Sequence, residues 1–317
     1  MTVDKSAFIN LDFNDIQSID AQLDLEASSH PVMSALKYGV KSAEGTAVVG
    51  AEGYYFICGG RNGWEEQFLG TMKLPETWST GWSARFEQRR TEAALRNVEL
   101  WNLVIPEKHG VLSRKRWPDG WGEGKLRPIN ALQSLAGAAH HLVYPLAELQ
   151  AAQLVAPTYL RHDSHWTATG CCVVGFSLLA HMGIRLDQAK HKITVKLHKV
   201  ARDLTEHLLD PAPQEEILLV QPPGEEVFHN RNFERTGRRR GTIFVIENAA
   251  APDARRVVVF GDSYTHDMGL AGFLSTVFQA VIFSWSNAIQ WDLAERMGAT
   301  VIIWQSAERF IVSVPEV

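Results

Sequence analysis

Hydrophobic residues run without a break over 257–260, directly before a polar Gly-Asp-Ser turn at 261–263. Three of these four residues are β-branched, which is typical of a strand buried on both faces of a parallel sheet. Helix-compatible and strand-like segments continue to alternate after the turn. The predicted elements are a helix over 270–278, a strand over 280–285, a helix over 290–297 and a strand over 300–304. This order predicts an α/β fold in which helices cover both faces of a parallel sheet.

The first half of the chain contains further elements of the same kind. Residues 46–58 alternate weakly around two glycines, which favours a β-hairpin. The spacing over 82–100 predicts an amphipathic helix, and 100–105 is typical of a buried strand. Residues 1–45 are mixed and polar, and we interpret them as a loosely packed N-terminal lead-in with one short helix. Residues 46–317 then form one large domain.

The pattern changes between about residues 186 and 250. Three segments have the composition of strands: 192–197, which alternates as if half exposed, 217–220 and 242–246. Prolines punctuate the region at positions 211, 213, 222 and 223. We interpret it as a β-rich insertion that flanks or caps the α/β core. A role in shaping an acceptor pocket and a purely structural role both stay open.

Composition narrows the function classes. With 317 residues, 45% hydrophobic and 21% charged, the chain resembles an ordinary globular protein. The net charge of −5 argues against nucleic-acid binding and a polybasic membrane patch. The arginines at 235 and 238–240 are a local exception, which we interpret as a solvated loop in preference to a polyphosphate site. No stretch approaches the length of a membrane span. The three cysteines cannot form a disulfide framework, and the adjacent Cys171 and Cys172 lie in an apolar run typical of buried thiols.

The first residues contain no cationic segment followed by an apolar run, so the sequence predicts no secretory signal. If Met1 is the native start, we expect a cytoplasmic protein. If the start has been trimmed, an extracytoplasmic location is open.

Ser263 is the strongest candidate for a catalytic residue. It lies at the carboxyl end of a predicted strand and the amino end of a helix, where open α/β sheets bind ligands and developing negative charge is favoured. A serine nucleophile needs a base, which works best when a carboxylate orients it. Asp163 and His165, two residues apart, have a spacing at which the carboxylate could orient the imidazole. The alternative is a surface Asp-Ser-His turn backed by a buried tryptophan, since Gly-Asp-Ser also occurs in ordinary loops.

Taken together, the two segments resemble the SGNH-hydrolase-like domain of the alginate O-acetyltransferases. In ordinary SGNH esterases the Gly-Asp-Ser block comes first, whereas here Asp-x-His-Trp-Thr precedes it by about a hundred residues, the order of the alginate branch. Weaker matches lie at 51–56, with Tyr54 where tryptophan is usual, at 104–108 and at 302–309. The resemblance spans roughly 45–312. It implies a three-layer α/β/α, SGNH-like fold with a flavodoxin-type parallel sheet.

The resemblance implies a reordered catalytic triad. Ser263 would be the nucleophile, His165 the base and then the acid, and Asp163 the group that orients the imidazole. Asp262 would serve the turn and the helix start. His266, three residues beyond Ser263 on a helix and next to Asp267, is an alternative base, although a side chain one turn along usually points away from the strand ends.

The oxyanion of an acyl-transfer intermediate needs at least two donors. We expect one to be the Ser263 N–H. Asn287, after the strand over 280–285, is the candidate for the second, although it could instead cap the following helix. Lys108 and Arg309 are candidates for the cleft lining together with Glu308, but a surface or structural ion pair is the favoured interpretation for all three.

The sequence and the resemblance together predict serine-dependent acyl transfer, namely O-acetylation of a saccharide hydroxyl through an acyl-Ser263 intermediate. Two alternatives stay open: an esterase in which water accepts the acyl group, and a non-catalytic carbohydrate-binding protein. The expected partners are an acyl donor and a carbohydrate or small-molecule acceptor, with no nucleic acid, membrane insertion or cofactor. A metal site at His162, Asp163 and His165 lacks a recognised ligand spacing, so we expect none. The oligomeric state stays open.

Overall fold

A mostly parallel sheet lies at the centre of the molecule. The computed structural model describes residues 8–60 and 62–316. The strands lie in the order β5 (Leu142–Val143), β4 (Glu99–Ile105), β12 (Val301–Ala307), β10 (Asp253–Gly261), β11 (Phe278–Trp285), β9 (Ile243–Glu247) and β8 (Glu225–His229). The first five are parallel to one another, whereas β9 is antiparallel to both β11 and β8. The α/β class expected from the sequence is confirmed.

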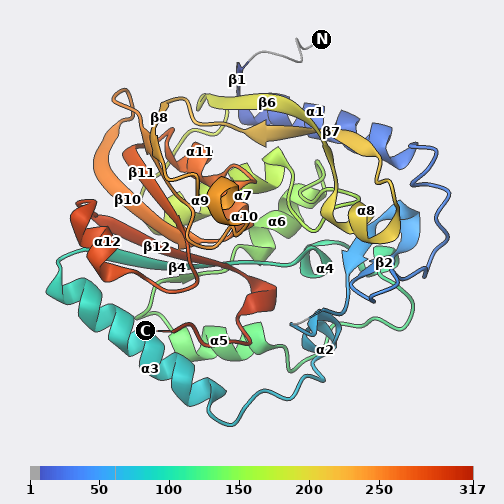
Figure 1. The fold of residues 1–317 in the computed structure, drawn as a ribbon, viewed down its shortest axis with the longest axis horizontal. Coiled ribbons are helices and arrows are strands. Elements are labelled where there is room, and N and C mark those ends of the chain that lie inside the picture. Colours follow the sequence, from blue (N-terminus) through green and yellow to red (C-terminus); the bar gives the residue numbers. More distant parts are fainter. Residues whose placement is uncertain (1–7, 61, 317) are drawn as a thin grey trace.

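Helices cover both faces of this sheet, which gives three layers (Figure 1). One face packs against α3 (Trp78–Leu95), α5 (Pro128–Ala136) and α12 (Trp291–Arg296), and the other against α6 (Leu146–Gln153), α7 (Ala168–His181) and α11 (Leu270–Leu274). Residues of β10 alternate between the layers: Val257 and Val259 lie in one core, and Val258 and Phe260 in the other, all fully buried. Each buried side chain contributes about 1.5–3 kcal/mol. Burial on both faces accounts for the unbroken hydrophobic run.

The β-rich segment from 186 to 250 divides between two sheets. Its strands β6 (Ile193–Ala201) and β7 (Gln214–Val220) pair antiparallel with each other, and β1 (Ile9–Leu11) completes this second sheet beside β6. Strands β8 and β9 instead extend the central sheet at one edge. The three strands predicted in this segment are confirmed. The division into a lead-in and one domain with an insertion stays a prediction.

The lead-in packs more firmly than the sequence suggested. Residues 1–7 of it lie outside the described part of the chain. Helix α1 (Phe13–Ser28) has 16 residues, contacts α7, and buries Ile16 completely. The polar residues of this helix made it look loosely packed in the sequence. One of them, Asp20, is buried and accepts a hydrogen bond from the Thr169 N–H, which compensates for its burial.

The remaining elements are short. The predicted hairpin consists of β2 (Ala47–Val49) and β3 (Tyr55–Ile57), paired antiparallel. The other helices are α2 (Trp64–Leu69), α4 (Lys108–Val111), α8 (Asp203–Leu208), α9 (Asn232–Thr236) and α10 (Ser263–His266), with 3-10 turns η1 (Ala51–Gly53), η2 (Arg114–Arg116) and η3 (Glu308–Phe310). The helix expected over 270–278 ends earlier, at Leu274, because β11 already begins at Phe278.

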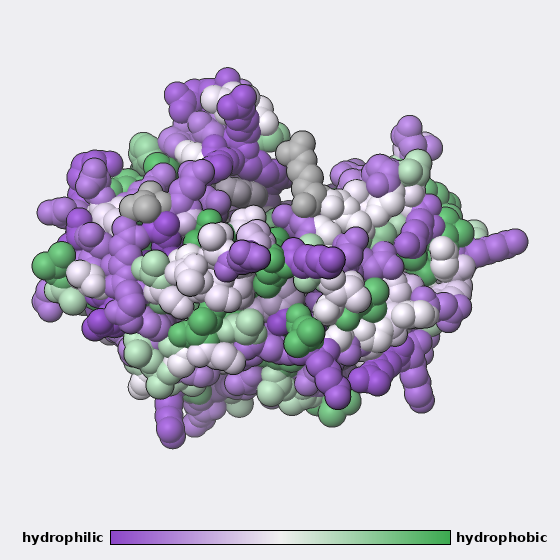
Figure 2. Space-filling view, turned by 90° about the horizontal axis from the view of Figure 1, so that it is seen from below, coloured by the Kyte–Doolittle hydropathy of each residue, from purple (hydrophilic) through white to green (hydrophobic). Residues whose placement is uncertain are grey.

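The surface carries both hydrophilic and hydrophobic residues (Figure 2). The face in Figure 2 is mainly hydrophilic, and its hydrophobic residues form small separate patches. Patches of this size are ordinary on globular proteins. Among the described helices, none has both the length and the hydrophobicity that a membrane crossing requires.

Candidate active site

Ser263 begins helix α10 directly after strand β10 ends at Gly261. Asp262 is the N-cap of α10, because its Oδ1 accepts a hydrogen bond from the Tyr264 N–H at 3.0 Å. Gln305, on the neighbouring strand β12, accepts a hydrogen bond from the Asp262 N–H through its Oε1, also at 3.0 Å. Asp262 therefore serves the turn and the helix start, as the sequence predicted.

His165 lies on the loop that leads from α6 to α7. The Leu160 N–H donates to the His165 carbonyl at 3.0 Å, which closes the loop, and Thr167 is the N-cap of α7. The Trp166 side chain is fully buried behind the loop. Its indole N–H donates to the Met268 carbonyl at 2.8 Å. This bond joins the histidine loop to the residues just beyond α10.

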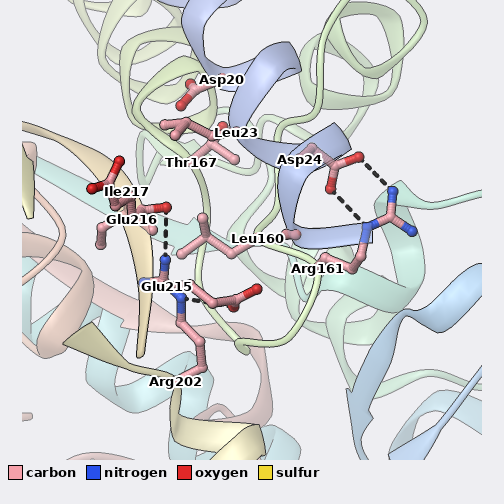
Figure 3. Close-up of a pocket in the computed structure, with 11 residues that line it drawn as sticks. Asp20, Leu23, Asp24, Leu160, Arg161, Thr167, Arg202, Glu215, Glu216 and Ile217 are labelled. Carbon is pink, nitrogen blue, oxygen red and sulfur yellow. Dashed lines mark hydrogen bonds and ion pairs between the residues drawn. The ribbon is translucent and has the colours of Figure 1, made fainter. Parts of the chain in front are cut away.

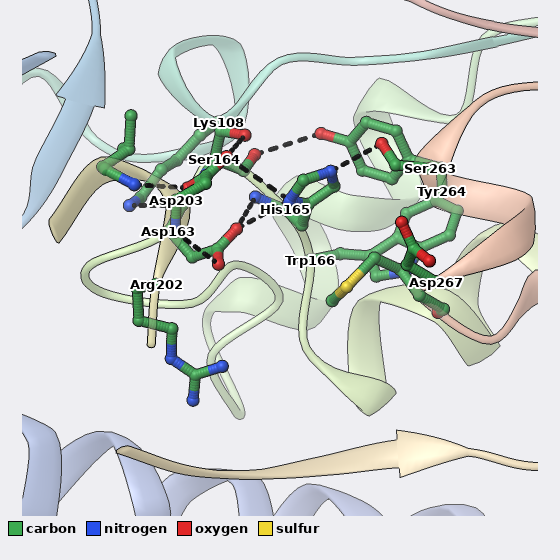
Figure 4. A network of polar contacts seen from close by, with 12 residues as sticks. Lys108, Asp163, Ser164, His165, Trp166, Arg202, Asp203, Ser263, Tyr264 and Asp267 are labelled. Atoms are coloured by element: carbon green, nitrogen blue, oxygen red, sulfur yellow. Dashed lines mark hydrogen bonds and ion pairs between the residues drawn. The ribbon is translucent and has the colours of Figure 1, made fainter. Parts of the chain in front are cut away.

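The structure brings Ser263, His165 and Asp163 together (Figure 4). The His165 Nε2 lies 2.7 Å from the Ser263 Oγ, and the His165 Nδ1 lies 2.7 Å from the Asp163 Oδ1. The same Asp163 oxygen accepts the His165 backbone N–H at 2.9 Å. The carboxylate therefore fixes both the ring and the backbone of the histidine. This arrangement can remove a proton from the serine hydroxyl.

Burial and charge set the protonation of this group. Burial of the imidazole opposes its protonation, but the Asp163 carboxylate outweighs that effect and, with help from Asp203, raises the pKa of His165 to about 9. Burial also opposes ionisation of Asp163, yet the adjacent His165 holds the pKa of that carboxyl well below its usual range. His165 must be neutral to accept a proton from Ser263, and its neutral form increases as the pH rises towards about 9.

Lys108 is buried beneath the histidine loop and supports it. Its Nζ donates to the carbonyls of Tyr55 at 2.7 Å, Arg161 at 2.8 Å and Asp163 at 3.0 Å. Burial lowers the pKa of Lys108 to about 7. The favoured expectation of an ion pair is wrong for Lys108, because in the described part of the chain its ammonium contacts backbone carbonyls and forms no ion pair.

Helix α1 also contacts this loop, through Asp24 and Arg161 (Figure 3). Asp24 accepts two hydrogen bonds from the Arg161 guanidinium, at 3.1 and 2.6 Å. Nearby, Arg202 pairs with Glu215 at 3.3 Å. The cavity between these groups has a volume of only about 20 Å³, room for about one water molecule. These ion pairs are therefore structural supports of the loop.

Arg309 and Glu308 form buried ion pairs, as the sequence favoured. The Arg309 Nη1 lies 2.6 Å from the Glu107 Oε1, and Glu308 pairs with Arg127. Arg309 also lines a cavity of about 190 Å³ together with Ser164 and Asp203, among other residues. It can therefore contact a ligand there while its charge remains compensated.

The oxyanion assignments stay predictions. Within the described residues, no hydrogen bond is found from the Ser263 N–H, so this donor is free for a ligand. Asn287 is exposed and does not cap α12, whose N-cap is Gln290. Its side-chain oxygen accepts from Arg240 at 3.1 Å, and it lines a cavity together with Asp262. No direct contact joins Asn287 to Ser263 in the described structure.

The alternative base, His266, has a different environment. Its Nδ1 is hydrogen bonded to the carboxylate of Asp267, and its ring packs against Phe244, Phe283 and Trp285. The Ser263 hydroxyl is hydrogen bonded to His165 instead. The geometry therefore favours His165 as the base.

The metal site considered in the sequence is not assembled. His162 turns away from the triad: its Nδ1 lies 2.8 Å from the Glu215 Oε1, and its ring packs on Tyr55. Ligand atoms of Asp163, His165 and Asp203 do lie within 4.8 Å of one another. Hydrogen bonds within the loop, and from Ser164 of the loop to Asp203 of α8, account for the positions of these atoms.

Sequence comparison identifies the family. A family model described as "SGNH hydrolase-like domain, acetyltransferase AlgX" matches residues 65–297, well over half of the chain. The chain belongs to this AlgX-type family. The probable alginate O-acetylase AlgJ of Azotobacter vinelandii is 24% identical over 282 residues, which cover 80% of this chain and 69% of that protein. The family predicted from the two sequence segments is confirmed.

Solved structures agree on the fold. A DHHW family protein from Eubacterium siraeum matches with a TM-score of 0.60 and 14% identity, over 87% of this chain and 96% of that one. The O-acetyltransferase domain of Pseudomonas putida AlgJ matches with a TM-score of 0.55 and 16% identity, over 86% of this chain and 94% of that one. The SGNH-like α/β architecture is therefore confirmed.

The segment that matches the AlgX-type family includes the whole triad and also Asp203, which sequence reasoning missed. Asp203 accepts the Ser164 N–H at 2.8 Å, and the Tyr264 hydroxyl donates to the Ser164 carbonyl at 3.1 Å. Ser164 is thus fixed on both sides, between the two triad residues of its loop. No local pattern predicts that α8 returns to this loop, because the contact is tertiary.

Proposed function

We propose that the protein transfers an acetyl group to a saccharide hydroxyl through an acyl-Ser263 intermediate. The observation that carries the proposal is the continuous hydrogen-bond chain from Asp163 through His165 to Ser263. It lies at the carboxyl end of a parallel strand, where this class of sheet binds ligands. Membership in a family of SGNH-like acetyltransferase domains supports acyl transfer as the chemistry.

The first half-reaction acylates the serine. The Ser263 Oγ bonds to the carbonyl carbon of the donor while its proton passes to the His165 Nε2. The bond from that carbon to the donor's leaving atom breaks, and the leaving atom takes the proton from Nε2. Asp163 stabilises the imidazolium in between, and the Ser263 N–H at the start of α10 is positioned to donate to the oxyanion.

The second half-reaction delivers the acetyl group. A hydroxyl of the acceptor gives its proton to the His165 Nε2, and its oxygen bonds to the acetyl carbon. The Ser263 Oγ then leaves with that proton, which regenerates the enzyme. Proton transfer by a positioned histidine contributes about 10²–10⁴-fold to steps of this kind.

A cavity beside the catalytic turn supports a saccharide acceptor. It has a volume of about 300 Å³ and extends from Gly261 and Asp262. Its wall combines aromatic side chains with amide and guanidinium groups: Trp285, Phe310, Asn62, Asn287 and Arg240. Aromatic faces can pack on a sugar ring, while the polar groups can bond its hydroxyls.

Transfer and hydrolysis can be separated with an activated acetyl ester. The purified protein would be incubated with 4-nitrophenyl acetate, with and without alginate oligosaccharides, and the acetylated sugar would be measured by mass spectrometry. We expect sugar-dependent acetylation that falls at least about 10³-fold in Ser263→Ala, because the triad acts as a unit. Ser134→Ala changes an exposed helical serine and serves as the matched control.

The set of sugars tested as acceptors distinguishes a transferase from an esterase. Equal hydrolysis with and without every sugar tested would identify an esterase and contradict the transferase proposal. Undiminished turnover in Ser263→Ala would contradict the serine mechanism altogether.

A further inference from the structure

A second carboxylate adjoins the triad histidine. Asp203 begins helix α8, in the β-rich segment between 186 and 250, and its Oδ2 lies 3.6 Å from the His165 Nδ1. Its carboxylate accepts both the N–H and the hydroxyl of Ser164. Its own N–H donates to the Asp163 Oδ2 at 3.3 Å. Asp203 therefore contacts every residue of the loop from Asp163 to His165 (Figure 4).

These contacts divide the support of the histidine between two carboxylates. Asp163 holds the ring and the backbone of His165 through one oxygen, Oδ1. Asp203 orients the other oxygen of Asp163 and fixes Ser164, the residue between them. Truncation of Asp203 would leave the Ser164 N–H without its acceptor, in a residue that is only 2% exposed.

We propose that Asp203 is a positioning residue of the reaction: it fixes the loop from Asp163 to His165, and its charge stabilises the protonated form of His165. The inference rests on the proposed function, because it concerns the base in that reaction. It assigns a role in the active site to the β-rich segment, through helix α8.

The surrounding charges act in both directions. Asp163 and Asp203 favour the imidazolium of His165, whereas Arg309 on η3 opposes it. Asp267, the C-cap of α10, also interacts with His165 electrostatically, and the Tyr264 ring lies 4.9 Å from the imidazole ring.

Asp203 has its own neighbours. Burial and the charge of Asp163 raise the pKa of Asp203, while His165 and the bonds from Ser164 lower it. Lys108 on α4 also interacts with the Asp203 charge. Asp203 keeps 37% of its side chain exposed, so solvent weakens the effect of its charge on His165. Among the described residues, it is still the only carboxylate besides Asp163 within 4 Å of a ring nitrogen of His165.

The consequence is a catalytic base that is held mostly protonated at neutral pH. Two carboxylates around one imidazole stabilise its cation, and the pKa of His165 rises to about 9. Neutral His165, the form that activates Ser263, then increases with pH up to that value. Removal of the Asp203 charge should lower the pH at which the base becomes active.

The test measures the reactivity of Ser263 without any acceptor. The rate of labelling by phenylmethanesulfonyl fluoride would be followed by intact mass from pH 5.5 to 10.5 and located by peptide mapping. The variant Asp203→Asn keeps an oxygen that can accept from Ser164 but has no charge. The control Glu206→Gln removes a charge from an exposed position of the same helix.

We expect the rise in wild-type labelling to centre near pH 9. In Asp203→Asn it should move down by about one pH unit, the lower end of the effect of a charge at this distance. Labelling at pH 7 would then be up to about tenfold faster, and Glu206→Gln should match the wild type. If Asp203→Asn does not fold, Asp203→Ser, which keeps a short hydroxyl acceptor, is measured in the same way.

The outcomes separate the two proposals. Slower labelling of the folded Asp203 variants at every pH, with an unmoved midpoint, would mean a purely structural residue and would overturn the inference. A midpoint that shifts equally in Glu206→Gln would also overturn it, because the effect would then be one of net charge. If Ser263 of the wild type is not labelled at any pH, the proposed function fails and the inference fails with it.

Discussion

The substitution Lys108→Met tests whether the support beneath the histidine loop matters for catalysis. The methionine side chain has a similar length and fits a buried apolar position, but it cannot donate a hydrogen bond. The carbonyls of Tyr55 and Asp163 lose their bond to the ammonium. The Arg161 carbonyl is less affected, since it also accepts the Tyr55 N–H at 2.9 Å.

Two opposing effects set the change in stability. Two buried acceptors that lose a donor cost about 2–6 kcal/mol. Against this, burial lowers the pKa of Lys108 from 10.5 to about 7, so removing the buried amine restores up to about 5 kcal/mol at neutral pH. If the whole of this gain is realised, the free energy of unfolding should lie between about 1 kcal/mol below and about 3 kcal/mol above that of the wild type. Activity should fall by about 10²-fold, because a shift of about 1 Å in Asp163 misaligns His165.

The assay compares urea unfolding with turnover of 4-nitrophenyl acetate, with Lys125→Met at an exposed position as the control. The sign of the pH effect gives a second check. Between about pH 7 and 10.5, folded Lys108 binds fewer protons than unfolded Lys108, so wild-type stability should rise with pH in this window. Lys108→Met should lack that rise. Turnover equal to that of Lys125→Met would refute the role assigned to the lysine.

Three other substitutions test separate parts of the structure. Burial raises the pKa of Asp20 to about 7 from its ordinary 3.8, so between about pH 3.8 and 7 native Asp20 keeps a proton that the unfolded chain loses, and stability should fall as the pH rises through this range. Asp20→Asn should remove that fall, with a gain of up to about 4 kcal/mol at pH 8 in urea unfolding. Gly261→Ala would place a Cβ 2.4 Å from the Gln305 Oε1, which should cost about 1–3 kcal/mol in the same measurement. Trp166→Phe leaves the buried Met268 carbonyl without its donor, and thermal unfolding should show a loss of about 1–3 kcal/mol.

The central sheet could be predicted from the sequence because its signals are local. The hydrophobic run over 257–260 indicates a strand buried on both faces, and both core clusters contain residues from it. The turn and the helix start at Ser263 depend on neighbouring residues, so they too were predictable. Asp163 and His165 were found because their family pattern is short and contiguous.

The supports of the site could not be predicted, because each is a contact between distant segments. Lys108 resembles a surface lysine after a strand, and only the folded chain brings three carbonyls to it. Asp203 resembles an ordinary first-turn acid of a short helix. The polar residues of α1 suggested a loose lead-in, since nothing local indicates that Asp20 accepts a hydrogen bond from Thr169 of α7 or that Asp24 accepts one from Arg161 of the histidine loop.

These two aspartates give the first helix a practical importance. Asp20 accepts a hydrogen bond from the N–H of Thr169 in the first turn of α7, and Asp24 accepts one from the Arg161 guanidinium in the histidine loop. A shortened version of the protein that starts after residue 30 would expose the apolar side of α7 and release both anchors. Such a version, even if it remained in solution, would lose the contacts that hold the His165 ring within hydrogen-bonding distance of Ser263.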